Sequence, residues 1–345
     1  MWVMLPDCGS GSGAGLHKAD LQSAGHRNIP KLKRMWSECV IVEGWRVYCI
    51  IFEKLSFIPV SEEGRVSRQS FENKIIIITG GSMGIGLATA EAIARQGGSL
   101  CLIARRPDPL ARAQQRVQAA AISPEQFVET LACDVTDESA LRPLLDDFIA
   151  RRGVPDVLIN AVGYSYPQRL ARLTLEDFRK QMEVNYFGQL IPTLMLLPHW
   201  LQRGGGHVSF VSSVLGYMSM IGFAGYAPTK YALFGLAETL RHELKPHGVS
   251  VSILFPPDTD TPGFERENLT KPPESAKLSE AGKLMTPEAV AQVYVAGLLK
   301  GRFEILPGEA GWIRLLSRLS PRFMRWYLDR ALRKLGRDEG AAGQK

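Results

Sequence analysis

Thr79-Gly80-Gly81-Ser82-Met83-Gly84-Ile85-Gly86 is the stretch that decides the fold. It follows an apolar run over residues 75–78 and precedes a helical pattern over residues 86–96. A strand that runs into a glycine-rich turn and then a helix predicts a dinucleotide site, because the glycines let the backbone approach a pyrophosphate and the helix start supplies amide donors. A glycine-rich turn without a ligand is the alternative for this motif taken alone. The cofactor-binding residues expected here are Gly80, Ser82, Met83, Gly84, Ile85 and Gly86.

Short apolar runs alternate with helical patterns beyond this motif. The predicted strands are residues 75–78, 100–103, 130–133, 157–159, 208–211 and 251–255, and the predicted helices are residues 86–96, 110–121, 138–151, 175–197 and 226–245. A late helix from Pro287, capped by Thr286, and a strand over residues 303–306 would complete the sheet edge. The alternation predicts an α/β fold, a Rossmann-type doubly wound parallel sheet of about seven strands with helices on both faces.

The chain of 345 residues divides by pattern into three regions. Residues 1–70 are irregular and predict a weakly ordered extension, residues 71–308 carry the strand and helix alternation, and residues 309–345 form a tail. Residues 40–60 are too often interrupted by charge to supply the ~20 apolar residues of a membrane span. Five cysteines, an odd number without metal-type spacing, predict reduced thiols in the cytoplasm and no metal site.

The net charge of +6 is concentrated in the tail, where residues 312–335 hold seven basic residues and one acidic residue. This local excess does not indicate a nucleic-acid partner. An apolar stripe and an arginine stripe recur at helical spacing, and Pro321 is expected to kink or split the helix. The first stripe is Trp312, Leu315, Leu316, Leu319, Phe323, Trp326 and Tyr327, and the second is Arg314, Arg318, Arg322 and Arg325. Such a helix suits the surface of an anionic membrane, or packs as an arm on the domain or on a second subunit.

Arg105 and Arg106 follow the second predicted strand, at the place where an NAD enzyme usually carries an acid for the ribose 2′-hydroxyl. Two guanidinium groups suit a 2′-phosphate instead, so NADPH/NADP+ is the expected cofactor. Side chains that are simply solvated at a strand end are the alternative. Asp134 and Val135 follow the third strand and are expected to flank the adenine. Asn160 follows the fourth and is expected to line the ribose side of the cofactor.

Ser213-x12-Tyr226-x3-Lys230 predicts proton transfer to a carbonyl. A phenol has a pKa near ~10, so an acid of this kind needs a neighbour that stabilises its anion. Lys230 lies one helical turn on; we expect it to lower the pKa of Tyr226 and to hold the nicotinamide ribose. Ser213 would donate to the substrate carbonyl. Asn185 would anchor a relay water, or else is a polar residue that kinks its helix and bonds to backbone.

From about residue 74 to residue 308 the chain resembles the short-chain dehydrogenase/reductase superfamily. The resemblance implies the catalytic tetrad Asn185, Ser213, Tyr226 and Lys230, with Tyr226 and Lys230 also touching the cofactor, and homo-oligomers. Within the superfamily, Phe255-Pro-Pro-Asp-Thr-Asp-Thr-Pro-Gly-Phe-Glu265 and Glu267-Asn268-x-Thr270-Lys271-Pro272 are similar to the 3-ketodihydrosphingosine reductase family, where a proline stands at Pro257 in place of the usual glycine. Further cofactor-binding residues implied in this segment are Pro256, Thr259 and Thr261. A rigid proline loop without a ligand role is the alternative.

The activity this resemblance implies is NADPH-dependent reduction of 3-oxosphinganine, a long-chain 2-amino ketone, to sphinganine in sphingolipid biosynthesis. Alternatives are a reductase of another lipid-like ketone, such as a steroid, retinoid or 3-oxoacyl derivative, and a non-catalytic NADPH-binding scaffold. Candidate walls for the alkyl chain, equally suited to an ordinary core, are Met218, Met220, Ile221, Phe223 and Phe264. Eukaryotic members of the family carry hydrophobic membrane segments that this sequence does not show. We expect a cytoplasmic enzyme, peripheral on the cytosolic face of the endoplasmic reticulum in a eukaryote or on the inner membrane in a bacterium.

Overall fold

The structure is a computed structural model that describes residues 70–280 and 282–342. The chain divides into two units, Met1–Arg65 and Val66–Lys345, and the described residues all belong to the second. The extension predicted over residues 1–70 therefore lies outside the described residues, apart from Ser70. Of the five cysteines, Cys101 and Cys133 are described, and both are buried free thiols.

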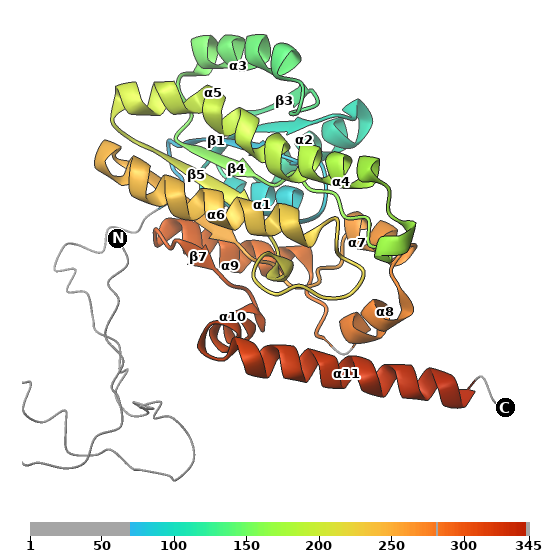
Figure 1. Cartoon of the computed structure of the whole chain (residues 1–345). Coiled ribbons are helices and arrows are strands. Elements are labelled where there is room, and N and C mark those ends of the chain that lie inside the picture. The colour runs from blue at the N-terminus through green and yellow to red at the C-terminus, as the bar shows by residue number, and fades with distance from the viewer. Residues whose placement is uncertain (1–69, 281, 343–345) are drawn as a thin grey trace, which may run out of the picture. The chain divides into compact units, whose positions relative to one another are not determined.

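Strands and helices alternate through the described region, as Figure 1 shows. The strands are β1 (Ile75–Thr79), β2 (Ser99–Ala104), β3 (Val128–Ala132), β4 (Val157–Asn160), β5 (Gly206–Val211), β6 (Val249–Leu254) and β7 (Glu304–Ile305). The α-helices are α1 (Gly84–Ala94), α2 (Pro107–Ala120), α3 (Glu138–Arg152), α4 (Leu175–Met182), α5 (Gly188–Arg203), α6 (Ala227–Leu244), α7 (Pro262–Asn268), α8 (Pro273–Glu280), α9 (Pro287–Leu299), α10 (Ala310–Leu319) and α11 (Pro321–Ala342). Short helical segments are η1 (Leu170–Arg172), η2 (Glu183–Phe187), η3 (Val214–Gly216) and η4 (Lys245–His247).

The seven strands form one parallel sheet in the order β3-β2-β1-β4-β5-β6-β7. This confirms the predicted doubly wound fold. The chain order reverses between β1 and β4, whose ends are paired through Thr79 and Asn160. In sheets of this kind the ligand crevice opens beyond the carboxyl ends of the strands at such a reversal point. The glycine-rich stretch leaves β1 at that edge.

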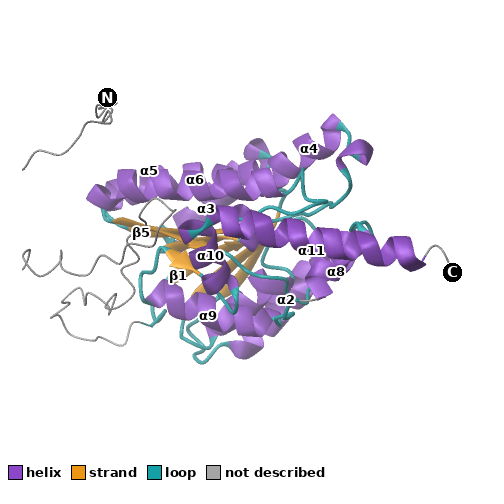
Figure 2. Cartoon of the chain, turned by 60° about the horizontal axis from the view of Figure 1, so that its bottom comes forward, coloured by secondary structure: helices purple, strands orange, loops and turns teal. Residues whose placement is uncertain are grey.

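Helices cover both faces of the sheet (Figure 2) because each strand carries apolar side chains on both sides. Ile77 points to the face covered by α3, α5 and α6, where Phe148, Trp200 and Leu233 complete one buried cluster. Ile76 and Ile78 point to the opposite face, which α1, α2 and α9 cover. Alternate side chains of one strand thus enter two separate cores, which is the expected outcome of the twofold period of a strand.

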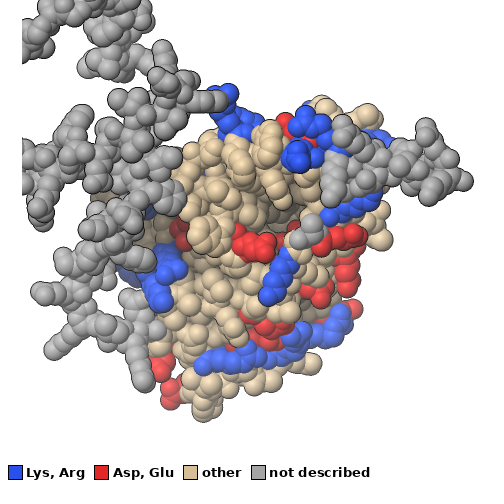
Figure 3. Space-filling view, turned by 90° about the horizontal axis from the view of Figure 1, so that it is seen from below, with Lys and Arg blue, Asp and Glu red and all other residues tan. Residues whose placement is uncertain are grey.

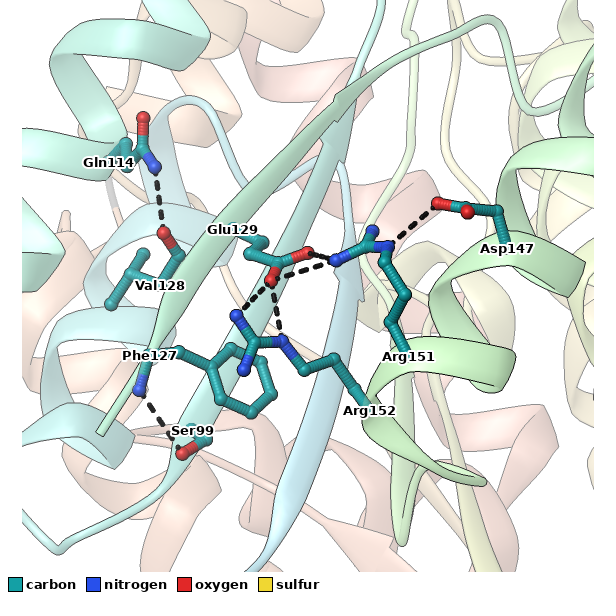
Figure 4. Close-up of polar contacts among 8 residues, drawn as sticks. All are labelled: Ser99, Gln114, Phe127, Val128, Glu129, Asp147, Arg151 and Arg152. Carbon is teal, nitrogen blue, oxygen red and sulfur yellow. Dashed lines mark hydrogen bonds and ion pairs between the residues drawn. The ribbon is translucent and has the colours of Figure 1, made fainter. Parts of the chain in front are cut away.

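The edge strand β3 begins two residues earlier than the predicted strand over residues 130–133 and ends at Ala132. Figure 4 shows how side chains fix it: the Glu129 carboxylate accepts hydrogen bonds from Arg151 and Arg152 at the end of α3, and the Arg152 guanidinium lies 4.4 Å from the centre of the Phe127 ring. Burial raises the pKa of Glu129, but the bonds from both arginines lower it further, so the net pKa lies below its ordinary value. The charged cluster covers a strand edge that would otherwise be open.

The helix predicted over residues 175–197 is interrupted. A π-helical turn, η2, separates α4 from α5. The helices α7 and α8, which follow β6, were not among the predicted helices. Each of the two begins at a proline, a residue that suits the first turn of a helix.

The tail forms two helices that break at Ser320, just before Pro321, as the sequence predicted. The start of α10 is part of the domain: Ala310 is buried, and its carbonyl accepts a hydrogen bond of 2.8 Å from the Tyr217 hydroxyl. Arg314, part of the predicted arginine stripe, forms two hydrogen bonds of 2.9 and 3.0 Å with Glu304 in β7. This residue packs on the domain, in agreement with the packing-arm alternative. No helix within the described ranges is both long and apolar enough to span a bilayer.

Candidate active site

The glycine-rich turn after β1 has a conformation that needs glycine. Gly80 has φ +72°, and a Cβ placed there would lie 2.8 Å from the carbonyl carbon of Ala161. A Cβ at Gly86 would lie 2.4 Å from the Gly80 carbonyl oxygen. No side chain caps the start of α1, and its first turn carries no acidic residue. The turn therefore offers amide donors to an anion with no competing side chain, and Ser82, Met83, Gly84 and Ile85 lie along it.

Arginines gather beside this turn. The Arg106 guanidinium approaches the Met83 sulfur to 3.9 Å, and Arg106 lines a cleft of about 460 Å³ together with Arg112 and Ser82. Arg105 instead pairs with Asp134 at 3.4 Å. Of the two predicted arginines, Arg106 thus faces the glycine turn, while Arg105 balances the acid that follows β3.

Three residues predicted to contact the cofactor have side chains that contact other residues of the protein. Asn160 is fully buried, and its amide donates to Thr193 at 3.0 Å while its oxygen accepts from the Thr79 hydroxyl at 3.4 Å. Its side chain ties β1 to β4 and α5, and its contact with the ribose stays a prediction. Val135 is buried in the core, and its place beside the adenine also stays a prediction. Asp134 accepts from the Thr136 hydroxyl and amide as well as pairing with Arg105.

Ser213, Tyr226 and Lys230 come together at the ends of β5 and the start of α6. Ser213 caps η3 by accepting from the Leu215 amide at 3.1 Å, and its hydroxyl also hydrogen-bonds the Tyr226 phenol. The Lys230 ammonium lies 5.5 Å from the centre of the Tyr226 ring and donates to the Val211 carbonyl at 2.9 Å. Tyr226 is partly exposed, whereas Lys230 is only 2% exposed. The Lys230 side chain is therefore the less exposed of the two.

Burial dominates the electrostatics of this pair. It raises the pKa of Tyr226 well above the ordinary value of a phenol, and the Glu267 and Asp258 carboxylates raise it further, while the bond from Ser213 lowers it. Burial also lowers the pKa of Lys230 to about 7. The expectation that Lys230 lowers the pKa of Tyr226 stays a prediction, and it applies to the charged form of the lysine.

Asn185 lies in the π-helical turn and holds the loop after β4. Its side-chain oxygen accepts from the Tyr164 amide at 2.7 Å, and its amide donates to the Tyr164 carbonyl at 2.9 Å and to the Thr229 hydroxyl at 3.0 Å. The Thr229 hydroxyl in turn donates to the Tyr226 carbonyl at 2.7 Å. Asn185 is thus bonded to backbone, which was one of its two interpretations, and it fixes the loop of Tyr164 against the first turn of α6. Its role in a water relay stays a prediction.

The segment after β6 closes against the glycine turn. The Thr261 hydroxyl caps α7 by accepting from the Phe264 amide at 3.1 Å, and its methyl group would lie 3.1 Å from a Cβ at Gly84. The Thr259 hydroxyl donates to the Pro257 carbonyl at 2.8 Å, and the Pro256 carbonyl accepts from the Val214 amide at 3.1 Å. Of these three predicted residues, Thr261 lies directly beside the turn expected to hold the cofactor.

The candidate alkyl walls divide between pocket and core. Met220, Ile221 and Phe223 line a second cleft of about 340 Å³. Met218 packs on the core cluster of the sheet. Phe264 lies beneath the Lys271 ammonium, at 4.5 Å from the ring centre. The cleft borders the Tyr226 side of the site, because the Phe223 and Tyr226 ring centres are 6.1 Å apart.

The sequence interpretation missed the charges beside the phenol. Glu267 forms an ion pair of 2.9 Å with Lys271, whose side chain has no exposed surface. The pKa of Glu267 is raised by burial, while Lys271 and a hydrogen bond from Ser165 oppose the rise. The sequence signal was the spacing of four residues between Glu267 and Lys271, which is ordinarily that of a solvated pair on a helix.

The residues present fit a nicotinamide dinucleotide. The close backbone packing at Gly80 and Gly86 forms the tight turn of a dinucleotide site, the uncapped start of α1 suits the pyrophosphate, and Tyr226 and Lys230 follow the carboxyl end of β5. Thr261, after β6, lies beside Gly84 of the glycine turn. This arrangement can place a hydride donor and a proton donor at one carbonyl group.

Comparisons with known proteins match this region of the chain. A family model described as short chain dehydrogenase matches residues 74–272. The 3-dehydrosphinganine reductase of Danio rerio is 36% identical over 239 residues, which cover 69% of this chain and 72% of that protein. The 3-ketodihydrosphingosine reductase of Dictyostelium discoideum is 35% identical over 248 residues, which cover 68% of this chain and 74% of that protein.

Solved structures match the same fold. A 3-oxoacyl-(acyl-carrier protein) reductase with bound NAD from Brucella melitensis is 25% identical with a TM-score of 0.57, and the match covers 66% of this chain and 84% of that chain. The residues matched by the family model include the glycine turn and the group of Ser213, Tyr226 and Lys230. The matched region also includes Glu267 and Lys271.

Proposed function

The chain belongs to the short chain dehydrogenase family, and on that premise we propose that it reduces 3-oxosphinganine to sphinganine with NADPH. The enzyme is a ketone reductase that takes a nicotinamide cofactor. The substrate and the choice of NADPH over NADH are the parts proposed here. The observation that carries the substrate is the identity of 36% to a 3-dehydrosphinganine reductase over 239 residues, 69% of this chain.

The side chains support proton transfer to a ketone oxygen. Bound reduced nicotinamide supplies a hydride to the carbonyl carbon. The Ser213 and Tyr226 hydroxyls, which bond to each other, both suit donation to the carbonyl oxygen, and Tyr226 gives up its proton as the C=O bond becomes C–OH. The raised pKa keeps Tyr226 protonated before the reaction, and the ammonium of Lys230 stabilises the phenolate that remains. Asn185 positions this group by holding the loop of Tyr164 against α6.

Charge at the end of β2 supports NADPH. Arg106 faces the glycine turn and shares its cleft with Arg112 and Arg116. Arg105 pairs with Asp134, so the acid that follows β3 has a cationic partner. A 2′-phosphate is a dianion that planar guanidinium groups bind well, whereas the ribose 2′-hydroxyl of NADH gains little from them.

The experiment is a steady-state assay of the purified full chain with 3-oxosphinganine and either NADPH or NADH, with the product identified by mass. The proposal predicts sphinganine and a kcat/KM that favours NADPH. Turnover of a steroid, a retinoid ketone or a 3-oxoacyl thioester without turnover of 3-oxosphinganine would reject the substrate. Equal use of both cofactors would reject the cofactor choice alone.

The tail supports contact with a membrane that holds such a lipid ketone. Trp312 and Leu319 are each 72% exposed, and Trp326 is about half exposed, so the tail presents large apolar side chains to solvent. Figure 3 views the protein from the side on which α10 and α11 lie and shows basic side chains interspersed with acidic and uncharged ones. Attraction to an anionic surface would therefore come from the tail itself, through residues such as Arg318 and Arg322. We also propose that the protein binds peripherally to the cytosolic face of the membrane and that it forms a homo-oligomer.

A further inference from the structure

Two carboxylates act electrostatically on the phenol of Tyr226. The charges of Glu267 and Asp258 each act on Tyr226 strongly enough to raise its pKa, and Glu267 is the larger contributor after burial. The same two carboxylates act on each other, since Asp258 also raises the pKa of Glu267. Glu267 stands on α7 and Asp258 on the loop after β6, so one edge of the site concentrates negative charge beside the proton donor.

Glu267 is held at this edge by a built set of contacts. Its Oε1 atom lies 2.9 Å from the Lys271 ammonium, and that ammonium is also 3.1 Å from the Ser279 hydroxyl and 4.5 Å from the centre of the Phe264 ring. The Ser165 hydroxyl is buried and has no hydrogen-bond partner among the described residues, and it acts on the Glu267 carboxylate by lowering its pKa. Ser165 follows Tyr164, which Asn185 fixes against α6.

The Glu267 carboxylate is thus connected to Tyr226 through side chains that pack against each other. The Lys271 ammonium lies 5.9 Å from the centre of the Phe223 ring, and that ring lies 6.1 Å from the ring of Tyr226. The backbone of Tyr164, which precedes Ser165, is held against the first turn of α6 by Asn185. A carboxylate has two oxygens and accepts charged donors at both, so a bond to Lys271 through Oε1 is compatible with a second cation.

The chemistry of the proposed substrate supplies that cation. A 2-amino ketone carries its amine on the carbon next to the carbonyl, so a carbonyl bound at Tyr226 and Ser213 brings an ammonium group to the same place. A steroid, a retinoid or a 3-oxoacyl ketone brings no cation there. Negative charge at this edge therefore separates the substrate classes by an interaction that only one of them makes.

We infer that Glu267 is the specificity residue that binds the 2-ammonium group of the substrate, with Lys271 holding its carboxylate in place and Ser165 and Asp258 completing the cation site. This inference rests on the proposed function. An ion pair that only anchors α7 is the alternative that the experiment must separate, because Lys271 and Phe264 would also serve such a purpose.

The experiment compares two ketones on the full-length enzyme with NADPH. One is 3-oxosphinganine and the other is the same chain without the amine, 1-hydroxyoctadecan-3-one. The variant is Glu267→Gln, which keeps the shape of the side chain and removes its charge, and the matched control is Glu265→Gln, an exposed glutamate on the same helix. A second variant, Glu267→Asp, keeps the charge and shortens the side chain. Thermal unfolding and NADPH binding by fluorescence are recorded for each protein.

The inference predicts that Glu267→Gln lowers kcat/KM for 3-oxosphinganine by roughly 10- to 100-fold, mainly through a higher KM, as expected for loss of one charge-assisted hydrogen bond. The same variant should leave kcat/KM for the deamino ketone nearly unchanged, Glu265→Gln should match the wild type on both, and Glu267→Asp should recover part of the preference for the amine.

Equal losses on both ketones, or a loss accompanied by a lower unfolding temperature that Glu267→Asp does not relieve, would overturn the inference in favour of an anchoring pair. Unchanged discrimination in Glu267→Gln would overturn it as well. If wild-type enzyme reduces only the deamino ketone, amine recognition is wrong while reductase activity stands. If it reduces neither ketone, the proposed function itself fails, and the inference fails with it.

Discussion

The Lys230 ammonium lies 5.5 Å from the centre of the Tyr226 ring and is almost wholly buried, whereas the ring is partly exposed at the crevice. A proton donor that faces the substrate is thereby backed by a cation that water does not screen. Burial disfavours the charged form of the lysine and lowers its pKa to about 7. The pair is consistent with a reductase that keeps its phenol protonated and needs positive charge only when the proton leaves.

Removal of the phenolic hydroxyl tests the proton donor. Tyr226→Phe should lower kcat for ketone reduction by about 10²- to 10⁴-fold, the usual contribution of a positioned general acid. NADPH affinity, measured by fluorescence, should change little. Tyr231→Phe, an exposed tyrosine on the same helix, is the matched control and should behave as wild type. Full reductase activity in Tyr226→Phe would favour the scaffold alternative.

The pH dependence of the reaction tests Lys230. Because burial lowers its pKa to about 7, the lysine is charged below that pH and neutral above it. Only the charged form stabilises the phenolate, so kcat/KM for reduction at subsaturating NADPH should fall as pH rises through about 7. Titration of Tyr226 does not change the pH profile near pH 7, since its raised pKa keeps it protonated at neutral pH. The deamino ketone should be used, to remove titration of the substrate amine. A flat profile through this range contradicts the assignment.

A methyl group in the glycine turn should impair cofactor binding. Gly80→Ala places a Cβ 2.8 Å from the Ala161 backbone at a φ of +72°, so the turn must distort. We expect weaker NADPH binding and a lower unfolding temperature. Gly235→Ala is the control, because no atom lies within 4 Å of its added Cβ, and alanine in a helix should stabilise by up to about 1 kcal/mol. Normal NADPH affinity in Gly80→Ala would argue against a pyrophosphate at this turn.

Cofactor choice should depend on Arg106. Arg106→Ala should raise the KM for NADPH by roughly 10- to 100-fold, as expected for loss of a charged contact to phosphate, and leave the KM for NADH nearly unchanged. Arg142→Ala removes an exposed arginine on α3 that pairs with Glu138 and serves as control. An equal rise in the KM for both cofactors would show that Arg106 does not distinguish a 2′-phosphate from a 2′-hydroxyl.

Substitutions in the tail should have two distinct effects, one on the stability of the fold and the other on membrane binding. Trp312→Ser with Leu319→Ser removes exposed apolar surface and should weaken binding to anionic liposomes without lowering the unfolding temperature. Arg314→Ala breaks a largely buried pair with Glu304 and should destabilise the fold by roughly 1–3 kcal/mol. Liposome binding that survives the loss of Trp312 and Leu319 would contradict the proposed membrane contact and leave the tail a packing arm.

Much of the sheet was predictable because its strands are short apolar runs between turn signals. Residues 75–78 and 157–159 were predicted to within one residue at each end. β3 was displaced because its side chains are mostly only partly buried and its register depends on β2 and on Arg151 and Arg152, which no local pattern encodes. The π-helical turn at residues 183–187 was also hidden, since its apolar spacing is compatible with an uninterrupted helix.

The catalytic group was predictable from spacing, since a strand end and a helical turn bring Ser213, Tyr226 and Lys230 together whatever surrounds them. Burial was not predictable: it makes Lys230 a weak acid near neutral pH and places Asn160 inside the sheet. The Glu267 and Lys271 pair was missed for the same reason. Their spacing of four residues is common on exposed helices, and only the packing of α7 and α8 against the Phe223 loop buries it.

The most direct test of the account is turnover of 3-oxosphinganine by the purified full-length protein with NADPH, beside the same assay of Tyr226→Phe. The account predicts stoichiometric NADPH oxidation and sphinganine in the wild-type reaction, and a loss of at least about 100-fold in the variant. No sphinganine from wild-type enzyme that binds NADPH normally, or equal rates for the two proteins, would contradict it.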